Sequence, residues 1–160
     1  MRTDADGAKE RDDIVRLVRR ARACLLEPSI ARKVELSRET HAWWFSAREN
    51  PPVNDDDGDD ETLDAIVENP GRETLRVVKS SQTRRIGKGG TLESRIAILH
   101  SLAHIESWAI DLSWDAISRF GLARDMPKGF YDDFVTVAND EARHHELLAR
   151  RLKALGSAYG

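Results

Sequence analysis

Cysteine is almost absent from this sequence of 160 residues, in which Cys24 is the only one. A single thiol cannot close a disulfide within the chain, and it excludes every zinc site that needs several cysteine ligands. A reducing, cytoplasmic environment is therefore the simpler expectation.

Long apolar runs are also missing. No segment approaches the roughly 20 consecutive apolar residues that a membrane-spanning helix needs. The N-terminal sequence MRTDADGAKERDD is too acidic for a signal or transit peptide. We therefore expect a soluble protein that makes no contact with membranes.

Charge of either sign is not in large excess. The net charge is −3, with 33% charged residues, which provides no general attraction for nucleic acid or anionic lipid. The sequence contains no internal repeat, no phosphate-binding P-loop and no GxGxxG dinucleotide fingerprint. Length and a hydrophobic fraction of 40% fit one globular domain.

The first third of the chain predicts helices. Residues 1–9 are polar and are expected to be disordered. Residues 10–50 form an N-terminal helical region, in which apolar side chains recur at helical spacing over residues 11–26. A second helix is predicted over residues 29–48, and the aromatic side chains near its end, Trp43, Trp44 and Phe45, should pack against later helices.

Residues 51–90 read as an irregular connector. Residues 54–61 are almost entirely acidic, so this run repels itself into an extended loop. A short helix is predicted over residues 62–68, ended by Asn69-Pro70-Gly71. A basic, irregular stretch follows.

Residues 91–160 predict a helical hairpin. One long helix spans about residues 91–120, and Gly121 can end it. A second runs over about residues 129–155 and stops at Gly156. Two long helices with a short link pack antiparallel, so the fold class is all-α.

Each long helix carries an acidic residue in the middle of an apolar stripe. At about 100° per residue, these residues share the side of Glu106: Leu99, Leu102, Ala103, Ile110, Ser113 and Ile117. These share the side of Glu141: Phe134, Val137, Ala138, Leu148 and Leu152. His144 lies one turn after Glu141 and completes a Glu-x-x-His motif.

Two buried carboxylates that face each other need a compensating cation, because an unpaired buried charge costs several kcal/mol. A metal ion supplies that charge, and a Glu-x-x-His motif directs a carboxylate and an imidazole at one point. The candidate metal ligands are therefore Glu106, Glu141 and His144. The alternative is a surface helix on which Glu141 meets solvent or an arginine.

The other histidines are harder to place. His104 is about 200° around the helix from Glu106, so the two side chains cannot face one metal. It shares its side with His100, where both rings could support the ligands from behind or lie at the surface. His145 borders the Glu141 stripe as closely as His144 does, and the helical wheel barely separates the two.

These motifs resemble a ferritin-like family that is catalogued only as domain of unknown function 455. The segments Leu99–Glu106 and Ala109–Leu112 resemble its first core helix. The segments Met126–Phe134 and Asp140–His144 resemble its second core helix. The segments Arg151–Gly156 and Tyr159-Gly160 fit the family too, and a weaker match extends upstream over Asn69–Arg72. The sequence is also similar, more distantly, to ferritin-like hydroxylases that modify transfer RNA, so transfer RNA is not excluded as a partner.

The resemblance implies a di-iron carboxylate site and selects His144 over His145 as the ligand; manganese is an alternative metal. The sequence departs from the family in three ways. His145 stands where the family usually has Phe, and the acidic run at 54–61 is atypical. Family members also continue beyond residue 160 into two more helices with another Glu and another Glu-x-x-His, so this chain corresponds to half of a four-helix bundle.

Two functional hypotheses follow. The first is an O2-activating oxidase or oxygenase of unknown small-molecule substrate, whose site is completed by a symmetric homodimer. The second is a truncated, non-catalytic helical protein that packs or binds a partner without metal. Whether the protein is an enzyme stays open, as does the idea that the helices over 11–48 cover the apolar stripes within one chain.

Overall fold

A computed structural model describes residues 4–46, 63, 65–73 and 88–160. These residues contain four helices and no strand, which confirms the predicted all-α class. The helices are α1 (Asp4–Leu26), α2 (Ile30–Phe45), α3 (Leu92–Phe120) and α4 (Lys128–Ala154). None of these described helices combines the length and the apolar character that crossing a membrane requires.

The ends of α3 and α4 follow from local chemistry. The Thr91 hydroxyl accepts a hydrogen bond from the Ser94 backbone N–H at 3.2 Å and caps the start of α3. Gly121 follows the last residue of α3, and Pro127 precedes α4. Gly156 has a φ of 75°, a left-handed conformation that favours glycine. This conformation turns the chain away from the axis of α4 just after the helix ends. The predicted limits of the two long helices are correct within a residue or two.

The other predicted limits need correction. Helix α1 begins at Asp4, so the structure places residues 4–9 in a helix where disorder was expected. Helix α2 ends at Phe45. The described residues of the segment 62–68 are not helical, so the short helix predicted there is wrong for them. The acidic run at 54–61 lies outside the described residues.

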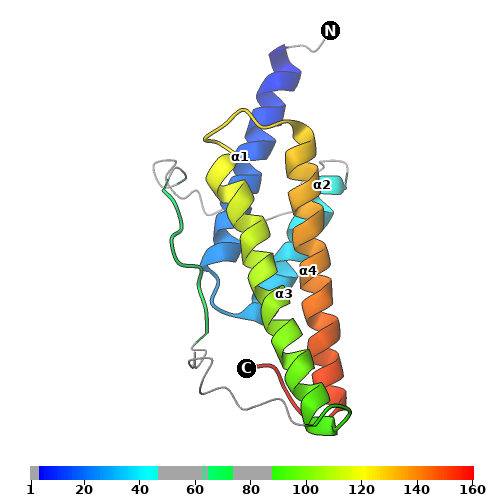
Figure 1. Ribbon diagram of the computed structural model, residues 1–160. Helices are drawn as coiled ribbons and strands as arrows, with labels where there is room; N and C mark the ends of the chain where they lie inside the picture. Colours follow the sequence, from blue (N-terminus) through cyan, green and yellow to red (C-terminus); the bar gives the residue numbers. More distant parts are fainter. Residues whose placement is uncertain (1–3, 47–62, 64, 74–87) are drawn as a thin grey trace.

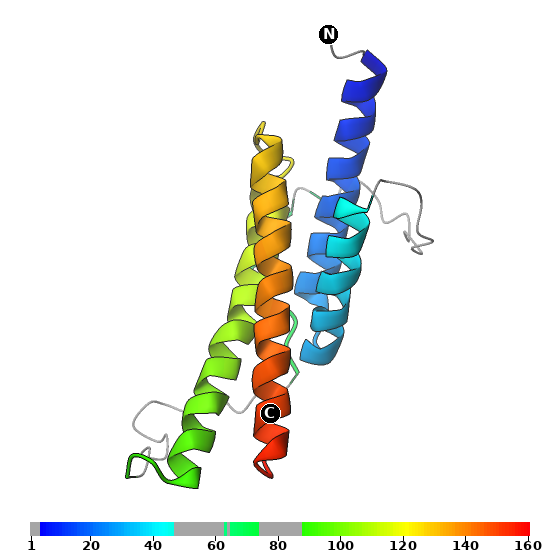
Figure 2. The ribbon, with the colours of Figure 1, turned by 90° about the vertical axis from the view of Figure 1, so that its right-hand side faces the viewer.

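The helices form two pairs. Helices α3 and α4 lie antiparallel along most of their length, and α1 and α2 cover one side of this hairpin, with α1 against α3 and α2 against α4 (Figures 1 and 2). The core between the pairs is made by buried apolar side chains, including Leu17, Ala21, Trp114, Ile117, Val135 and Ala138. None of the described helices lies against the opposite side of the hairpin (Figure 2).

A buried ionic cluster holds the two pairs together. The Lys33 ammonium on α2 donates to Asp111 on α3 at 2.5 Å and to the Leu25 carbonyl at 3.1 Å. The guanidinium of Arg72, from the connector, also donates to Asp111. It donates to the Ser107 carbonyl at 2.8 Å as well. Burial raises the pKa of Asp111 and the two cations oppose that rise, so the carboxylate depends on both partners.

Gly71 sets the position of Arg72. The Gly71 N–H donates to the Leu25 carbonyl at 2.7 Å, which docks the connector on the turn between α1 and α2. A Cβ at this residue would lie 2.1 Å from the Leu26 carbonyl oxygen, so only glycine fits. This close approach explains why glycine precedes the arginine that enters the core.

The aromatic residues at the end of α2 behave differently from one another. The Trp44 indole donates to Asp132 on α4 at 2.7 Å, as expected for packing on a later helix. Trp43 lies under the guanidinium of Arg20 on α1, 4.6 Å from its ring centroid. Phe45 is exposed, because it lies at the last turn of α2 and faces away from the hairpin; the expectation of packing is wrong for it.

Candidate metal centre

Three side chains of the hairpin converge halfway along it. Glu106 of α3 and Glu141 and His144 of α4 each offer a ligand atom, and these atoms lie within 4.8 Å of one another. The His144 Nδ1 atom is 3.2 Å from a Glu141 carboxylate oxygen and 3.7 Å from a Glu106 carboxylate oxygen. Among the described residues, no other group of three such side chains is found.

The hairpin itself brings these residues to one level. Glu106 lies fifteen residues before Gly121, and Glu141 lies fourteen residues after Pro127. Because each helical residue rises about 1.5 Å, the two carboxylates stand at nearly equal heights above the connection. The Glu-x-x-His spacing then places His144 one turn along the same face of α4.

The two carboxylates shift each other's pKa in opposite directions. A hydrogen bond with Glu141 is the main cause that raises the pKa of Glu106 to about 7, followed by partial burial and the negative charge of Glu141. The same hydrogen bond lowers the pKa of Glu141. These opposite shifts are those of two adjacent carboxylates that repel each other when both are charged, and a metal cation would relieve the same repulsion.

The cluster is less enclosed than the sequence suggested. The side chains of Glu106 and Glu141 are 22% and 23% exposed, and that of His144 is 46% exposed. Ala103, Ile110 and Ala138 close it from the core side. Leu102 and Val137, expected to continue the buried stripes, are exposed instead, because α1 and α2 cover the other side of the hairpin. Helices α1 and α2 therefore cover part of the stripes, in which Ile110, Ile117 and Ala138 are fully buried.

The structure separates His144 from His145. His144 points at the two carboxylates, whereas His145 is 4% exposed and meets the ring of Tyr159 edge-on, at 4.9 Å between ring centroids. Successive residues of a helix point about 100° apart. His144 therefore faces the carboxylate cluster, whereas His145 is buried in the core.

His100 and His104 also gather around Tyr159. The Tyr159 hydroxyl is 3.2 Å from His104 Nδ1 and 3.1 Å from the Ser107 hydroxyl. The His100 ring lies 5.2 Å from that of Tyr159. The three additional histidines therefore surround a C-terminal tyrosine on the flank of the hairpin instead of standing behind the candidate ligands. From the sequence, Tyr159 was named only as part of the family resemblance and had no role, because no helical period could place it.

His145 predicts a pH-dependent stability. Burial is the main cause that lowers its pKa from 6.5 to about 4, and the charge of Arg72 adds to it. As pH falls from 6.5 to 4, the unfolded chain takes up a proton that the folded chain excludes, so the free energy of unfolding falls. Between pH 7 and pH 4.5, the free energy of unfolding of the unsubstituted protein should fall by about 2 kcal/mol more than that of the His145→Phe variant.

Urea unfolding of metal-free protein across that pH range measures this difference. His41→Phe, on α2, is the control and should follow the unsubstituted protein. Parallel stability curves for His145→Phe and the unsubstituted protein would contradict the assignment of a buried neutral imidazole to His145.

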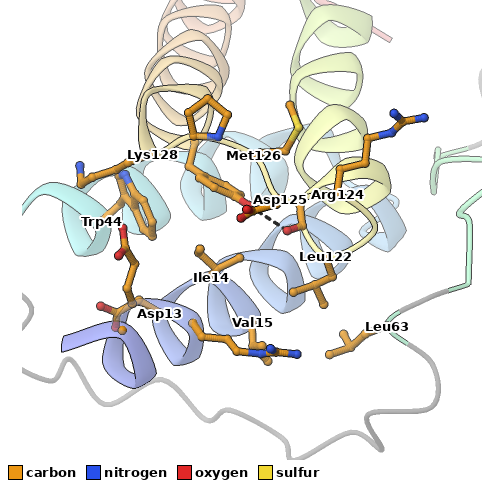
Figure 3. A pocket seen from close by; sticks show the side chains of 16 residues that line it. Asp13, Ile14, Val15, Trp44, Leu63, Leu122, Arg124, Asp125, Met126 and Lys128 are labelled. Carbon is orange, nitrogen blue, oxygen red and sulfur yellow. Dashed lines mark hydrogen bonds between the residues drawn. The ribbon is translucent and has the colours of Figure 1, made fainter. Parts of the chain in front are cut away.

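A cavity of about 920 Å³ lies at the far end of the bundle from Tyr159. It is lined by the first turns of α1, by Trp44 and by the connection between α3 and α4, and the Tyr131 hydroxyl donates to the Gly121 carbonyl at its wall (Figure 3). Its charged lining residues are of both signs, including Asp125 and Lys128. The cavity and the carboxylate cluster share no residue.

Comparisons with known proteins extend over most of the chain. A family model described as "Protein of unknown function (DUF455)" matches residues 26–160. An uncharacterised protein of Haemophilus influenzae is 42% identical over 74 residues, which are 44% of this chain and 26% of that protein. The match thus covers about a quarter of the length of that relative. No solved structure matches.

Proposed function

The chain belongs to the family described as DUF455, and we propose that its carboxylate cluster is a ferritin-like di-iron site that serves an O2-activating oxidase or oxygenase. The substrate class in this proposal is a small molecule. The observation that carries the proposal is the convergence of Glu106, Glu141 and His144, with ligand atoms within 4.8 Å of one another.

The donor set fits iron. Two carboxylates and one imidazole are ligands that iron and manganese accept, and they lack the thiolates that favour zinc. The raised pKa of Glu106 beside Glu141 adds an electrostatic argument, since a bound cation would remove the repulsion between the two carboxylates. Iron in such a site supplies the one-electron and O2 chemistry that protein side chains lack.

Each ligand has a distinct part in the proposal. Glu106 and Glu141, which approach each other across the hairpin, would hold the metal through their carboxylates. His144 would complete this set of ligands through its imidazole. The buried side chains of Ala103, Ile110 and Ala138 exclude water from the core side of the cluster, which protects reactive species from it.

A second function is favoured by a separate observation. The hairpin exposes large apolar side chains beside the cluster, including Ile105 and Leu112, and such a surface suits a partner-binding protein that needs no metal. In that alternative, the chain is a non-catalytic relative, and Glu106 and Glu141 hold no metal.

Metal loading separates the two functions. After anaerobic loading with Fe(II) and removal of the excess, we expect at least about one iron per chain by elemental analysis, because Glu106, Glu141 and His144 offer a set of ligands for one metal. Glu141→Ala should weaken binding by at least about tenfold, as ligand removal does in metal sites. The matched control is Glu146→Ala on the same helix, whose carboxylate pairs with Arg38; it should bind like the unsubstituted protein.

Two outcomes would favour the metal-free alternative. One is a protein that retains no stoichiometric iron or manganese. The other is a Glu141→Ala variant that binds metal as tightly as the Glu146→Ala control.

A further inference from the structure

The cavity at the far end of the bundle is large enough for a small molecule. Its volume is about 920 Å³, within the range of about 300–1,000 Å³ that is typical of ligand sites. It lies between α1, the end of α2 and the connection between α3 and α4 (Figure 3). Because no lining residue belongs to the carboxylate cluster, a ligand bound there would be separate from the proposed metal.

Two aromatic rings form a fixed wall of the cavity. Trp44 and Tyr131 both line it, and their ring centroids are 6.2 Å apart. Each side chain is held by a hydrogen bond: the Trp44 indole donates to Asp132 at 2.7 Å, and the Tyr131 hydroxyl donates to the Gly121 carbonyl at 2.8 Å. Rings that are already ordered offer a ligand a flat apolar surface and lose little entropy when it binds.

Aliphatic side chains and a thioether continue this apolar wall. Four partly buried residues contribute to it, two from α1 and two from the connection: Ile14, Val15, Leu122 and Met126. Gly121 allows the connection to approach α1 closely, because a Cβ at this residue would lie 2.9 Å from a methyl carbon of Val18. The apolar part of the lining therefore suits a ligand with an aromatic body.

Charged side chains of both signs also line the cavity. The lining residues include three acids and three bases: Glu10, Asp13, Asp125, Arg11, Arg124 and Lys128. Burial is the main cause that raises the pKa of Tyr131, and the charges of Asp125 and Glu10 add to the rise. These two carboxylates therefore lie near the Tyr131 ring, although one comes from α1 and the other from the connection. A negative region thus adjoins the aromatic wall.

Arg11 is the base best placed to meet a bound carboxylate. Lys128 already donates to both carboxylate oxygens of Asp132, at 2.7 Å and 2.5 Å. The guanidinium of Arg124 points away from the middle of the cavity (Figure 3). Arg11 lines the cavity from α1, next in sequence to Glu10. A positive side chain therefore lies beside the negative region.

We propose that this cavity binds a small aromatic zwitterion of the amino-acid type. The ring of the ligand lies against Trp44 and Tyr131. Its ammonium group pairs with Asp125 and Glu10, and its carboxylate pairs with Arg11. A ligand of one sign would leave lining charges of the other sign without water and without a partner, which costs free energy. A zwitterion avoids this cost because it is complementary to both signs.

Isothermal titration calorimetry of the full, metal-free chain with L-phenylalanine tests the proposal. We expect one saturable site per chain, with a dissociation constant of about 1 mM or below. Three analogues each lack one group: 3-phenylpropionate lacks the ammonium group, phenethylamine lacks the carboxylate and glycine lacks the ring. Each should bind at least about tenfold more weakly than L-phenylalanine, because each leaves part of the lining without its partner.

Two substitutions test where the charged groups of the ligand lie. Asp125→Asn should weaken L-phenylalanine binding by about tenfold and should not weaken binding of 3-phenylpropionate, which has no ammonium group. Arg11→Gln should weaken L-phenylalanine binding by about tenfold and should not weaken binding of phenethylamine. The matched control is Asp133→Asn, at an exposed carboxylate of α4 outside the cavity; it should bind L-phenylalanine like the unsubstituted protein.

The absence of saturable L-phenylalanine binding at millimolar concentrations would overturn the proposal. Equal affinities for L-phenylalanine and the three analogues would overturn the zwitterion class. An Asp125→Asn variant that binds as tightly as the Asp133→Asn control would overturn the site of the ammonium group, and an unaffected Arg11→Gln variant would overturn that of the carboxylate. The protein is metal-free throughout, so these results do not depend on whether the carboxylate cluster binds iron.

Discussion

Lys33→Met is expected to lower the free energy of unfolding by about 3–5 kcal/mol, the cost of leaving one member of a buried ion pair without its partner. The Lys33 side chain is fully buried, and that of Asp111 is nearly so. The methionine side chain fills a similar volume, so the loss would come from the charge and not from a cavity. Arg72 still reaches Asp111, which places the expected cost at the lower end of the range.

Urea unfolding at pH 7 measures this cost. Arg32→Met is the matched control, because Arg32 pairs with Glu35 and Glu39 at the surface and exposed pairs contribute less than about 1 kcal/mol. Combining Lys33→Met with Asp111→Leu should recover part of the stability, since no unpaired carboxylate then remains. A cost for Lys33→Met no larger than that for Arg32→Met would show that the buried cluster contributes nothing particular.

Trp114→Ala is expected to lower the free energy of unfolding by about 3–5 kcal/mol, through lost burial and the cavity that remains. Trp114 lies fully buried on α3 at the junction of the two helix pairs. Its indole N–H donates to the Ser37 hydroxyl on α2 at 2.9 Å. Removing the ring therefore also leaves a buried hydroxyl with one partner fewer.

The same unfolding measurement checks this expectation, with two comparisons. Phe45→Ala removes an aromatic ring that is exposed and should cost less than about 1 kcal/mol. Trp114→Phe keeps most of the apolar volume and loses the hydrogen bond to Ser37, so it should cost about 1–2 kcal/mol. Equal losses for Trp114→Ala and Phe45→Ala would contradict the central place of Trp114 in the core.

The two long helices were predictable because their signals are local. Apolar spacing, the cap at Thr91 and the glycines at 121 and 156 act within a few residues. The start of α1 was missed because its first turns have few apolar side chains. Without them, the sequence shows no helical spacing of apolar residues that would predict a helix. The histidines around Tyr159 could not be assigned either, because their partner lies after the end of α4.

The buried cluster of Lys33, Arg72 and Asp111 had no sequence signal strong enough to find. Asp111 could be seen on the side of α3 that carries His104, but its partners come from α2 and from the connector. Lysine is almost never fully buried without a partner, so the sequence alone favours a solvated position for Lys33. The three residues come together only when α2, α3 and the connector pack against one another.

The sequence by itself determined the all-α class, the hairpin and the residue types of the candidate ligands, because helical period and equal distance from one short connection fix which side chains share a level. Tertiary structure alone decided which side of the hairpin α1 and α2 cover, and hence that the carboxylate cluster has an open side. That choice depends on contacts between residues far apart in the chain, such as Trp114 with Ser37 and Lys33 with Asp111, and no local pattern encodes such contacts.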